Sequence, residues 1–93
     1  MEQVWKTVQG FPHYAISTSG EVRSSRRKVP RLLKPVLVDG HPIVRLCNDR
    51  VSVNYRLSRL VLSTFKPAHG DLRAKHLDND PKNNCVDNLY WGK

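Results

Sequence analysis

The chain has 93 residues, a length at which one domain with one small core is expected, because chains usually divide only well beyond this size. Sixteen Lys and Arg against eight Asp and Glu give a formal charge of +8. Such an excess attracts polyanions, so nucleic acid is the expected partner, and a basic protein that uses its charge only for solubility is the alternative. A mean hydropathy of −0.54 and the lack of any run of 18 apolar residues predict no membrane partner.

Two further features bear on the compartment. The N-terminus lacks the basic stretch followed by an apolar stretch that secretion requires. The two cysteines, Cys47 and Cys85, are too few for a disulfide scaffold, and both are expected to stay reduced. These features predict a cytoplasmic protein.

The first part of the chain, residues 4–24, alternates short apolar pieces with turn residues. Gly and Pro interrupt every possible helical window, so short antiparallel strands are expected. Ser19-Gly20 predicts a hairpin turn between strands at 14–17 and 21–24, in which Gly20 supplies a positive φ.

A run of positive charge follows at residues 23–34. It contains no acidic residue, and its cations are Arg23, Arg26, Arg27, Lys28, Arg31 and Lys34. Side chains of like charge this close repel one another unless a polyanion relieves them. A mobile solvated loop is one interpretation, and contact with nucleic-acid phosphates is the one that the net charge favours.

Residues 36–47 return to an apolar pattern. Asp39-Gly40 predicts a turn into a strand at 41–47, in which Val44 and Leu46 share the buried face.

The period changes from two to 3.6 within residues 53–65. Leu57, Leu60, Val61 and Phe65 form the apolar stripe of a helix, and Arg56 and Arg59 lie away from it, where they can contact phosphates. Ser52 or Asn54 is the expected N-cap, and Pro67 and Gly70 end the helix.

Half of the acidic residues lie in the last quarter of this basic chain, at Asp71, Asp78, Asp80 and Asp87. Residues 75–91 read as a short strand, a turn rich in Asp, Asn and Pro, and the start of a helix capped by Asn84. This turn would bring Asn88 toward His76, so that the Asn oxygen accepts from one imidazole N–H and leaves the other nitrogen free to take a proton from water. The alternative is that both residues only tie the strand to the helix.

Three blocks of residues, in order along nearly the whole chain, resemble phage and intron-type HNH endonucleases that carry an N-terminal NUMOD4 module. The matching residues are Trp5, Gly10, Tyr14, Ile16, Ser17, Gly20, Val22, Arg23 and Ser24, then Arg59, Leu60, Val61 and Phe65, then His76, Leu77, Asp78, Asn83, Asn84, Asn88, Leu89 and Trp91. Asn79 stands where the family usually has Gly, and Asn also tolerates a left-handed turn position.

The resemblance implies an α+β fold: a small N-terminal antiparallel β module, one central helix and a ββα-metal motif at the C-terminal end. One domain is expected over residues 1–93, with a NUMOD4-like segment at 1–34 and an HNH-like segment at 41–93. The helix that completes the ββα motif would fall beyond Lys93, so the motif is expected to be truncated.

The resemblance also implies the chemistry, which is hydrolysis of DNA phosphodiesters. His76 matches the general base, Asn88 the residue that orients it, and one divalent cation such as Mg²⁺ stabilises the leaving oxygen. Lys75 stands where active members offer a metal ligand, and a protonated Lys has no lone pair for a metal. Asp78 or Asp80 could supply oxygens to the cation instead, and Asp78 is the predicted ligand.

Three functions follow from this reading. The first is a phage-type protein of the bacterial cytoplasm that binds double-stranded DNA and cleaves it weakly or not at all. The second is a regulator or inhibitor that binds a host protein or nucleoprotein complex through a decayed HNH fold. The third is an active Mg²⁺-dependent nickase.

Overall fold

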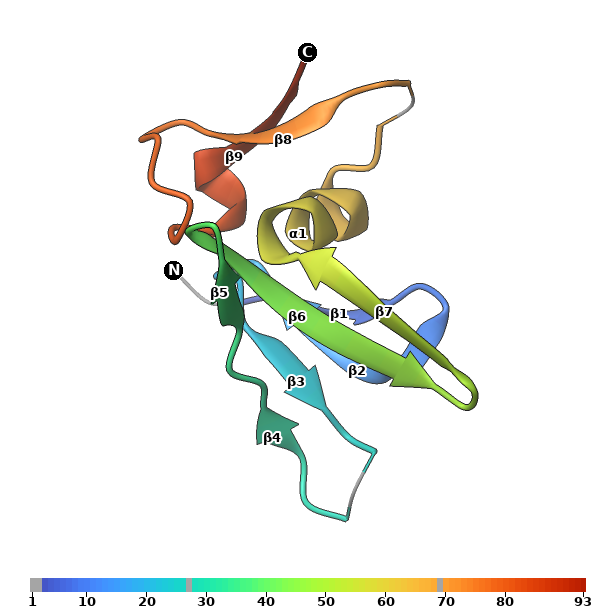
Figure 1. The fold of residues 1–93 in the computed structure, drawn as a ribbon. Helices are drawn as coiled ribbons and strands as arrows, with labels where there is room; N and C mark the ends of the chain where they lie inside the picture. Colours follow the sequence, from blue (N-terminus) through green and yellow to red (C-terminus); the bar gives the residue numbers. More distant parts are fainter. Residues whose placement is uncertain (1–2, 27, 69) are drawn as a thin grey trace.

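The computed structural model describes residues 3–26, 28–68 and 70–93. Within them the fold is compact and mixed: mostly antiparallel strands with one α-helix (Figure 1). The elements are β1 (Trp5–Val8), β2 (Phe11–Ser17), β3 (Val22–Ser24), β4 (Arg31–Leu32), β5 (Val36–Val38), β6 (His41–Asn48), β7 (Val51–Arg56), α1 (Leu57–Phe65), β8 (Arg73–His76), the 3₁₀ turn η1 (Val86–Asn88) and β9 (Leu89–Gly92). No helix in these ranges is long and apolar enough to cross a membrane.

The N-terminal sheet has the strand order β1-β2-β3-β4. Its β2–β3 hairpin confirms the predicted turn, because Ile16 pairs with Val22 and Gly20 has a φ of +86°. The alternating pattern of β2 buries Tyr14 and Ile16 on one face.

The second sheet has the order β5-β6-β7. Asp39 and Gly40 connect β5 to β6 with φ values of +52° and +81°, as in the two-residue turns that suit the twist of a hairpin. Val44 and Leu46 lie on the buried face of β6, as predicted.

The predicted cap of the helix is wrong. Ser52 and Asn54 belong to β7, where they pair with Cys47 and Arg45. The chain passes from β7 directly into α1, and the N-cap position is Arg56, which makes no side-chain capping hydrogen bond. Pairing with β6 therefore outweighs local capping at these residues.

The helix lies at the centre of the fold, between the β8–β9 hairpin and the two larger sheets (Figure 1). Its Leu60, Val61 and Leu62 are buried and share one core with Leu46 of β6 and Leu89 of β9. This core joins all three sheets, so the hairpin that carries His76 is held by the same packing as the N-terminal strands.

The predicted second helix start is also wrong. Residues 86–88 form the single 3₁₀ turn η1, and the chain continues as β9, which pairs with β8 through Ala74 and Trp91. The loop between the strands turns at Asn79, whose φ of +60° is the left-handed conformation expected of that position. Asn84 caps no helix, because its side chain faces His76 instead.

The turn between β2 and β3 rests on the segment that follows Asn84. The Val86 backbone N–H donates to the carbonyl oxygen of Thr18 over 2.8 Å. A Cβ on Gly20 would lie 2.7 Å from the carbonyl oxygen of Asn84, so only glycine permits this approach. The N-terminal sheet thus directly supports the loop around His76.

Candidate functional site

His76 ends strand β8, and its ring is held by Asn84. The His76 Nε2 and the Asn84 Oδ1 are 2.8 Å apart. The Asn84 Nδ2 donates to the Pro81 carbonyl oxygen over 3.1 Å, which orients the amide with its oxygen toward the ring. An amide oxygen only accepts, so Nε2 carries the proton and Nδ1 of the neutral ring is the basic nitrogen.

The predicted contact between Asn88 and His76 is wrong. The Asn88 Nδ2 donates to the Asp78 Oδ1 and to the Asn83 carbonyl oxygen, both over 2.9 Å, and its Oδ1 accepts from the Asp78 N–H over 3.3 Å. The backbone of Asn88 is held at the end of β8 as well, because its carbonyl oxygen accepts from the Leu77 N–H over 2.7 Å. Asn84, interpreted from the sequence as a cap residue, is the partner of the ring.

Asp78 serves as the acceptor at the centre of the loop. Its Oδ1 accepts from Asn88 and from the Asp80 N–H, and its Oδ2 accepts from the Asn83 Nδ2 over 2.9 Å. These hydrogen bonds, that from Asn83 first, lower the pKa of the carboxyl from 3.8 to about 2.

The family resemblance implies a divalent cation, but the side chains around His76 are not a suitable set of ligands for one. Both carboxylate oxygens of Asp78 already accept hydrogen bonds within the loop, and the neighbouring Lys75 is a cation. No group of three His, Cys, Asp or Glu side chains that could hold a metal occurs in the described ranges. The described residues around His76 therefore do not by themselves fit a metal centre, and the predicted role of Asp78 as a ligand gains no support from this geometry.

The Asp78 carboxyl should titrate at about pH 2, measured by following its side-chain ¹³C resonance by NMR. Replacing Asn88 with alanine removes one donor to the carboxylate and should raise this pKa toward the ordinary value. Because the pKa is lower in the folded protein, the ionised carboxylate stabilises the folded state at any pH above the ordinary pKa of 3.8. This contribution is lost as the pH falls from about 4 to about 2. Asn48→Ala, which removes an amide from a different turn, should leave the Asp78 pKa unchanged; an equal shift would contradict the assignment.

A hollow of about 390 Å³ opens beside His76. It is lined by His41, Arg56, Ser58, Arg59, Arg73, Ala74, Lys75 and His76, which include three Arg, one Lys and no acidic side chain. Arg56 and Arg59 were predicted from the sequence to contact nucleic acid, whereas His41, Arg73 and Lys75 were not. Arg73 and Lys75 precede His76 in the same strand, a signal that was present in the sequence.

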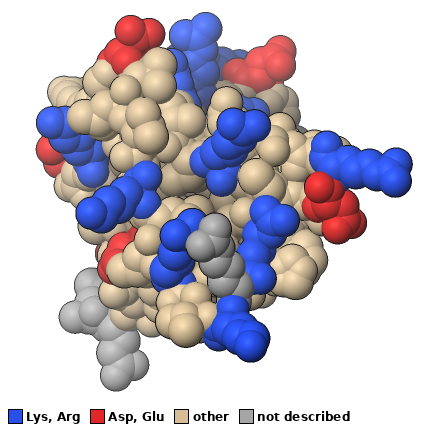
Figure 2. Space-filling model, turned by 60° about the horizontal axis from the view of Figure 1, so that its bottom comes forward, with Lys and Arg blue, Asp and Glu red and all other residues tan. Residues whose placement is uncertain are grey.

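The basic run at 23–34 divides between several places. Arg23 stacks on the Trp5 ring at 4.6 Å from its centroid, and Arg26, Arg31 and Lys34 line two further hollows beside β4 and β6. Lys28 is exposed and lines neither hollow, and the predicted Arg27 lies outside the described residues. Figure 2 shows Lys and Arg side chains spread across one face of the molecule, with the acidic side chains mostly at its edges.

Comparison with known proteins agrees with this arrangement of one helix and three small sheets. The NUMOD4 motif matches residues 3–47. An HNH endonuclease of Acanthamoeba polyphaga mimivirus is 30% identical over 89 residues, which are 94% of this chain and 26% of the relative. The solved structure of the HNH homing endonuclease I-HmuI, described for DNA binding and cleavage, has a TM-score of 0.87 at 31% identity and covers 100% of this chain and 53% of its own.

These likenesses define a class of nuclease-related proteins. The chain belongs to the HNH-type endonuclease family and carries the NUMOD4 motif of that family. It spans about a quarter of the length of the mimivirus relative and about half of the I-HmuI chain.

Proposed function

We propose that this chain binds double-stranded DNA and places one phosphodiester beside His76. The observation that carries the proposal is the hollow at His76, where Arg56, Arg59, Arg73 and Lys75 line the walls without any carboxylate. A phosphate group entering this hollow meets positive charge from β7, α1 and β8 together. DNA binding and cleavage by the similar I-HmuI are in line with such a ligand.

The outer face of β6 extends the binding surface away from His76. His41, Ile43 and Arg45 share the face of this strand opposite the buried Val44 and Leu46. His41 lines the hollow at His76, and Arg45 lines the two hollows beside the basic run. A DNA strand lying along this face would therefore contact both basic regions at once.

His76 is suited to take a proton from a water molecule that attacks the phosphodiester. The hydrogen bond to Asn84 holds the ring with Nε2 protonated, so that Nδ1 is the acceptor for the proton. The neighbouring cations bind the phosphate and hold it close to the ring. Asn84 is the positioning residue in this arrangement, in place of Asn88.

We propose further that cleavage is weak or lost. Lys75 supplies a positive charge where the resemblance calls for a metal ligand, and the Asp78 oxygens are occupied by Asn83, Asn88 and the Asp80 N–H. Without an ion the leaving oxygen would be stabilised only by Lys and Arg side chains. The alternative of an active Mg²⁺-dependent nickase rests on the retained His76.

Binding to a short duplex should weaken steeply as salt rises, because each phosphate contact releases condensed counterions. We expect the logarithm of the binding constant, measured by fluorescence anisotropy, to fall with the logarithm of the NaCl concentration with a slope of about −4 to −7 between about 50 and 200 mM. Each phosphate contact contributes about −0.9 to this slope. A flat slope, or no binding at the lowest salt, would overturn the proposal. Recovery of a stoichiometric protein partner after nuclease treatment would favour the regulator instead.

Supercoiled plasmid incubated with the protein and Mg²⁺ or Mn²⁺ should stay largely intact, as followed on agarose gels. Any residual nicking should disappear in His76→Ala and fall about 10- to 100-fold in Asn84→Ala, since general-base catalysis is worth about 10²- to 10⁴-fold. Asn88→Ala, which leaves the contact to the ring in place, is the matched control. Rapid nicking by the wild-type protein would overturn the proposal of weak cleavage and would support the active nickase.

A further inference from the structure

A second cationic hollow, separate from the one at His76, lies beside the N-terminal sheet. Its volume is about 420 Å³, and it is lined by Tyr14, Ser24, Arg26, Val29, Arg31, Leu33, Arg45 and Cys47. It shares no residue with the hollow at His76. Its three arginines come from three separate segments: the turn after β3, strand β4 and strand β6.

One residue that lines this hollow, Tyr14, is buried and held by a hydrogen bond. Tyr14 is 5% exposed, and its hydroxyl oxygen accepts from the Cys47 backbone N–H over 3.1 Å. This hydrogen bond leaves the phenolic O–H able to donate. The hollow is thus lined by the hydroxyls of Tyr14 and Ser24 together with three arginine side chains, and such donors are typical of sites for phosphate oxygens.

The local field in the hollow is positive. None of the described residues that line it is Asp or Glu. The pKa of the Cys47 thiol is lowered, first by the hydrogen bond with the Ser52 hydroxyl, against the opposing effect of burial, and then by the charges of Arg26 and Arg45. Charges gathered in this way repel one another in the free protein, and a bound anion would remove that repulsion.

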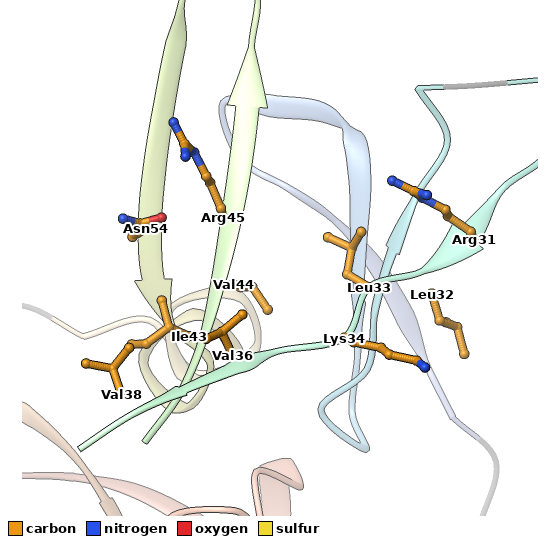
Figure 3. A pocket seen from close by; sticks show the side chains of 10 residues that line it. All are labelled: Arg31, Leu32, Leu33, Lys34, Val36, Val38, Ile43, Val44, Arg45 and Asn54. Atoms are coloured by element: carbon orange, nitrogen blue, oxygen red, sulfur yellow. The ribbon is translucent and has the colours of Figure 1, made fainter. Parts of the chain in front are cut away.

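The hollow continues into an apolar one along the outer face of β6. Arg31, Leu33 and Arg45 line both, and the second, of about 660 Å³, also contains Val36, Val38 and Ile43. In Figure 3 the valines and Ile43 gather at one end, and Arg31 and Arg45 lie away from them. A ligand that suits both hollows has a phosphate for the cationic one and a less polar group attached to it for the apolar one. A nucleotide unit has this composition.

We propose that Arg26, Arg31 and Arg45, with the Tyr14 hydroxyl, form a binding site for one phosphate group, and that the apolar hollow next to it takes the sugar or base attached to that phosphate. The natural source is a DNA strand, an identification that rests on the proposed function; a free nucleotide would offer the same chemistry. The site anchors the strand at the end of the β6 face remote from His76.

The site can be tested on the whole chain with sodium pyrophosphate as the probe, at constant ionic strength. The ¹⁵N-detected NMR signals of the Arg45 guanidinium and the Cys47 amide should shift in a saturable manner. Arg45→Met should weaken pyrophosphate binding at least about 10-fold, whereas Arg50→Met, which removes an exposed charge from the β6–β7 turn, should not. Shifts that do not saturate, or that are equally weakened in both variants, would overturn the site.

A short duplex and a free mononucleotide distinguish the two sources. Saturation by pyrophosphate together with competition by the duplex supports the site and its place on DNA. Saturation by pyrophosphate and the mononucleotide, without any binding of the duplex, keeps the phosphate site and overturns the proposed function. Binding of the duplex without any response to pyrophosphate keeps DNA binding and overturns this site.

Discussion

Replacing Gly20 with alanine is expected to destabilise the protein by about 2–4 kcal/mol, through backbone strain of about 1–2 kcal/mol and overpacking of a similar size. Gly20 has a φ of +86°, and its added Cβ would lie 2.7 Å from the carbonyl oxygen of Asn84 and 3.2 Å from the Asn84 Cβ. Neither backbone segment can yield easily, because the Val86 N–H holds them together at the Thr18 carbonyl oxygen. Chemical denaturation followed by tryptophan fluorescence measures the loss.

Gly10→Ala is the matched control. Gly10 has a similar φ of +83°, but an added Cβ meets nothing within 4 Å. It should cost only the backbone strain, about 1–2 kcal/mol. An equal decrease in the free energy of unfolding in the two variants would show that the close approach of Gly20 to Asn84 does not add to the cost of the substitution.

The Gly20 variant should also change the site. A displaced Asn84 can no longer accept from the His76 Nε2 over 2.8 Å, so the imidazole would lose its preference for the Nε2-protonated tautomer. The ¹⁵N chemical shifts of the His76 ring report the tautomer directly. Unchanged shifts in a folded Gly20→Ala protein would show that the contact of Gly20 with the loop does not control the tautomer of the His76 ring.

Removing three positive charges from the hollow at His76 is expected to weaken DNA binding about 100- to 1000-fold. The variant combines Arg56→Gln, Arg73→Gln and Lys75→Gln, and each side chain lines the hollow. Each contact between a phosphate and a solvent-exposed cation is expected to contribute about 1 kcal/mol, and the salt slope should fall by about 1 for each lost contact. Fluorescence anisotropy at several salt concentrations measures both quantities.

The control carries the same loss of net charge at other places. Arg50, Lys66 and Lys82 are exposed and line neither the hollow at His76 nor the two hollows beside the basic run. Their replacement with Gln should change affinity less than about 10-fold, because distant charges act only through the screened overall field. A similar loss in both triple variants would mean that net charge alone, and not this hollow, governs binding.

Much of the fold could be predicted from local pattern. The Asp39-Gly40 and Ser19-Gly20 turns, the alternation of Val44 and Leu46 and the apolar stripe of α1 depend on neighbours a few residues apart, and all were confirmed. The wrong predictions are the cap of α1, the helix start near Asn84, where the chain forms η1 and β9, and the contact between Asn88 and His76. Asn54 is a plausible cap by type, but its pairing with Arg45 across the sheet places it in β7.

The family, the positive charge and His76 as the candidate base could be inferred from the amino-acid sequence, because each depends on residue types and spacing along the chain. The folded chain was needed to show that Asn84 holds the ring, that His41 and Arg73 line the same hollow, and that Gly20 supports the loop. These groups belong to separate elements or to opposite sides of a loop, and they meet only through the packing of α1 against three sheets and the register of β8 with β9. Residue type alone leaves open which amide of this asparagine-rich loop faces the histidine, and in the folded loop it is Asn84, while Asn88 bonds to Asp78 and Asn83.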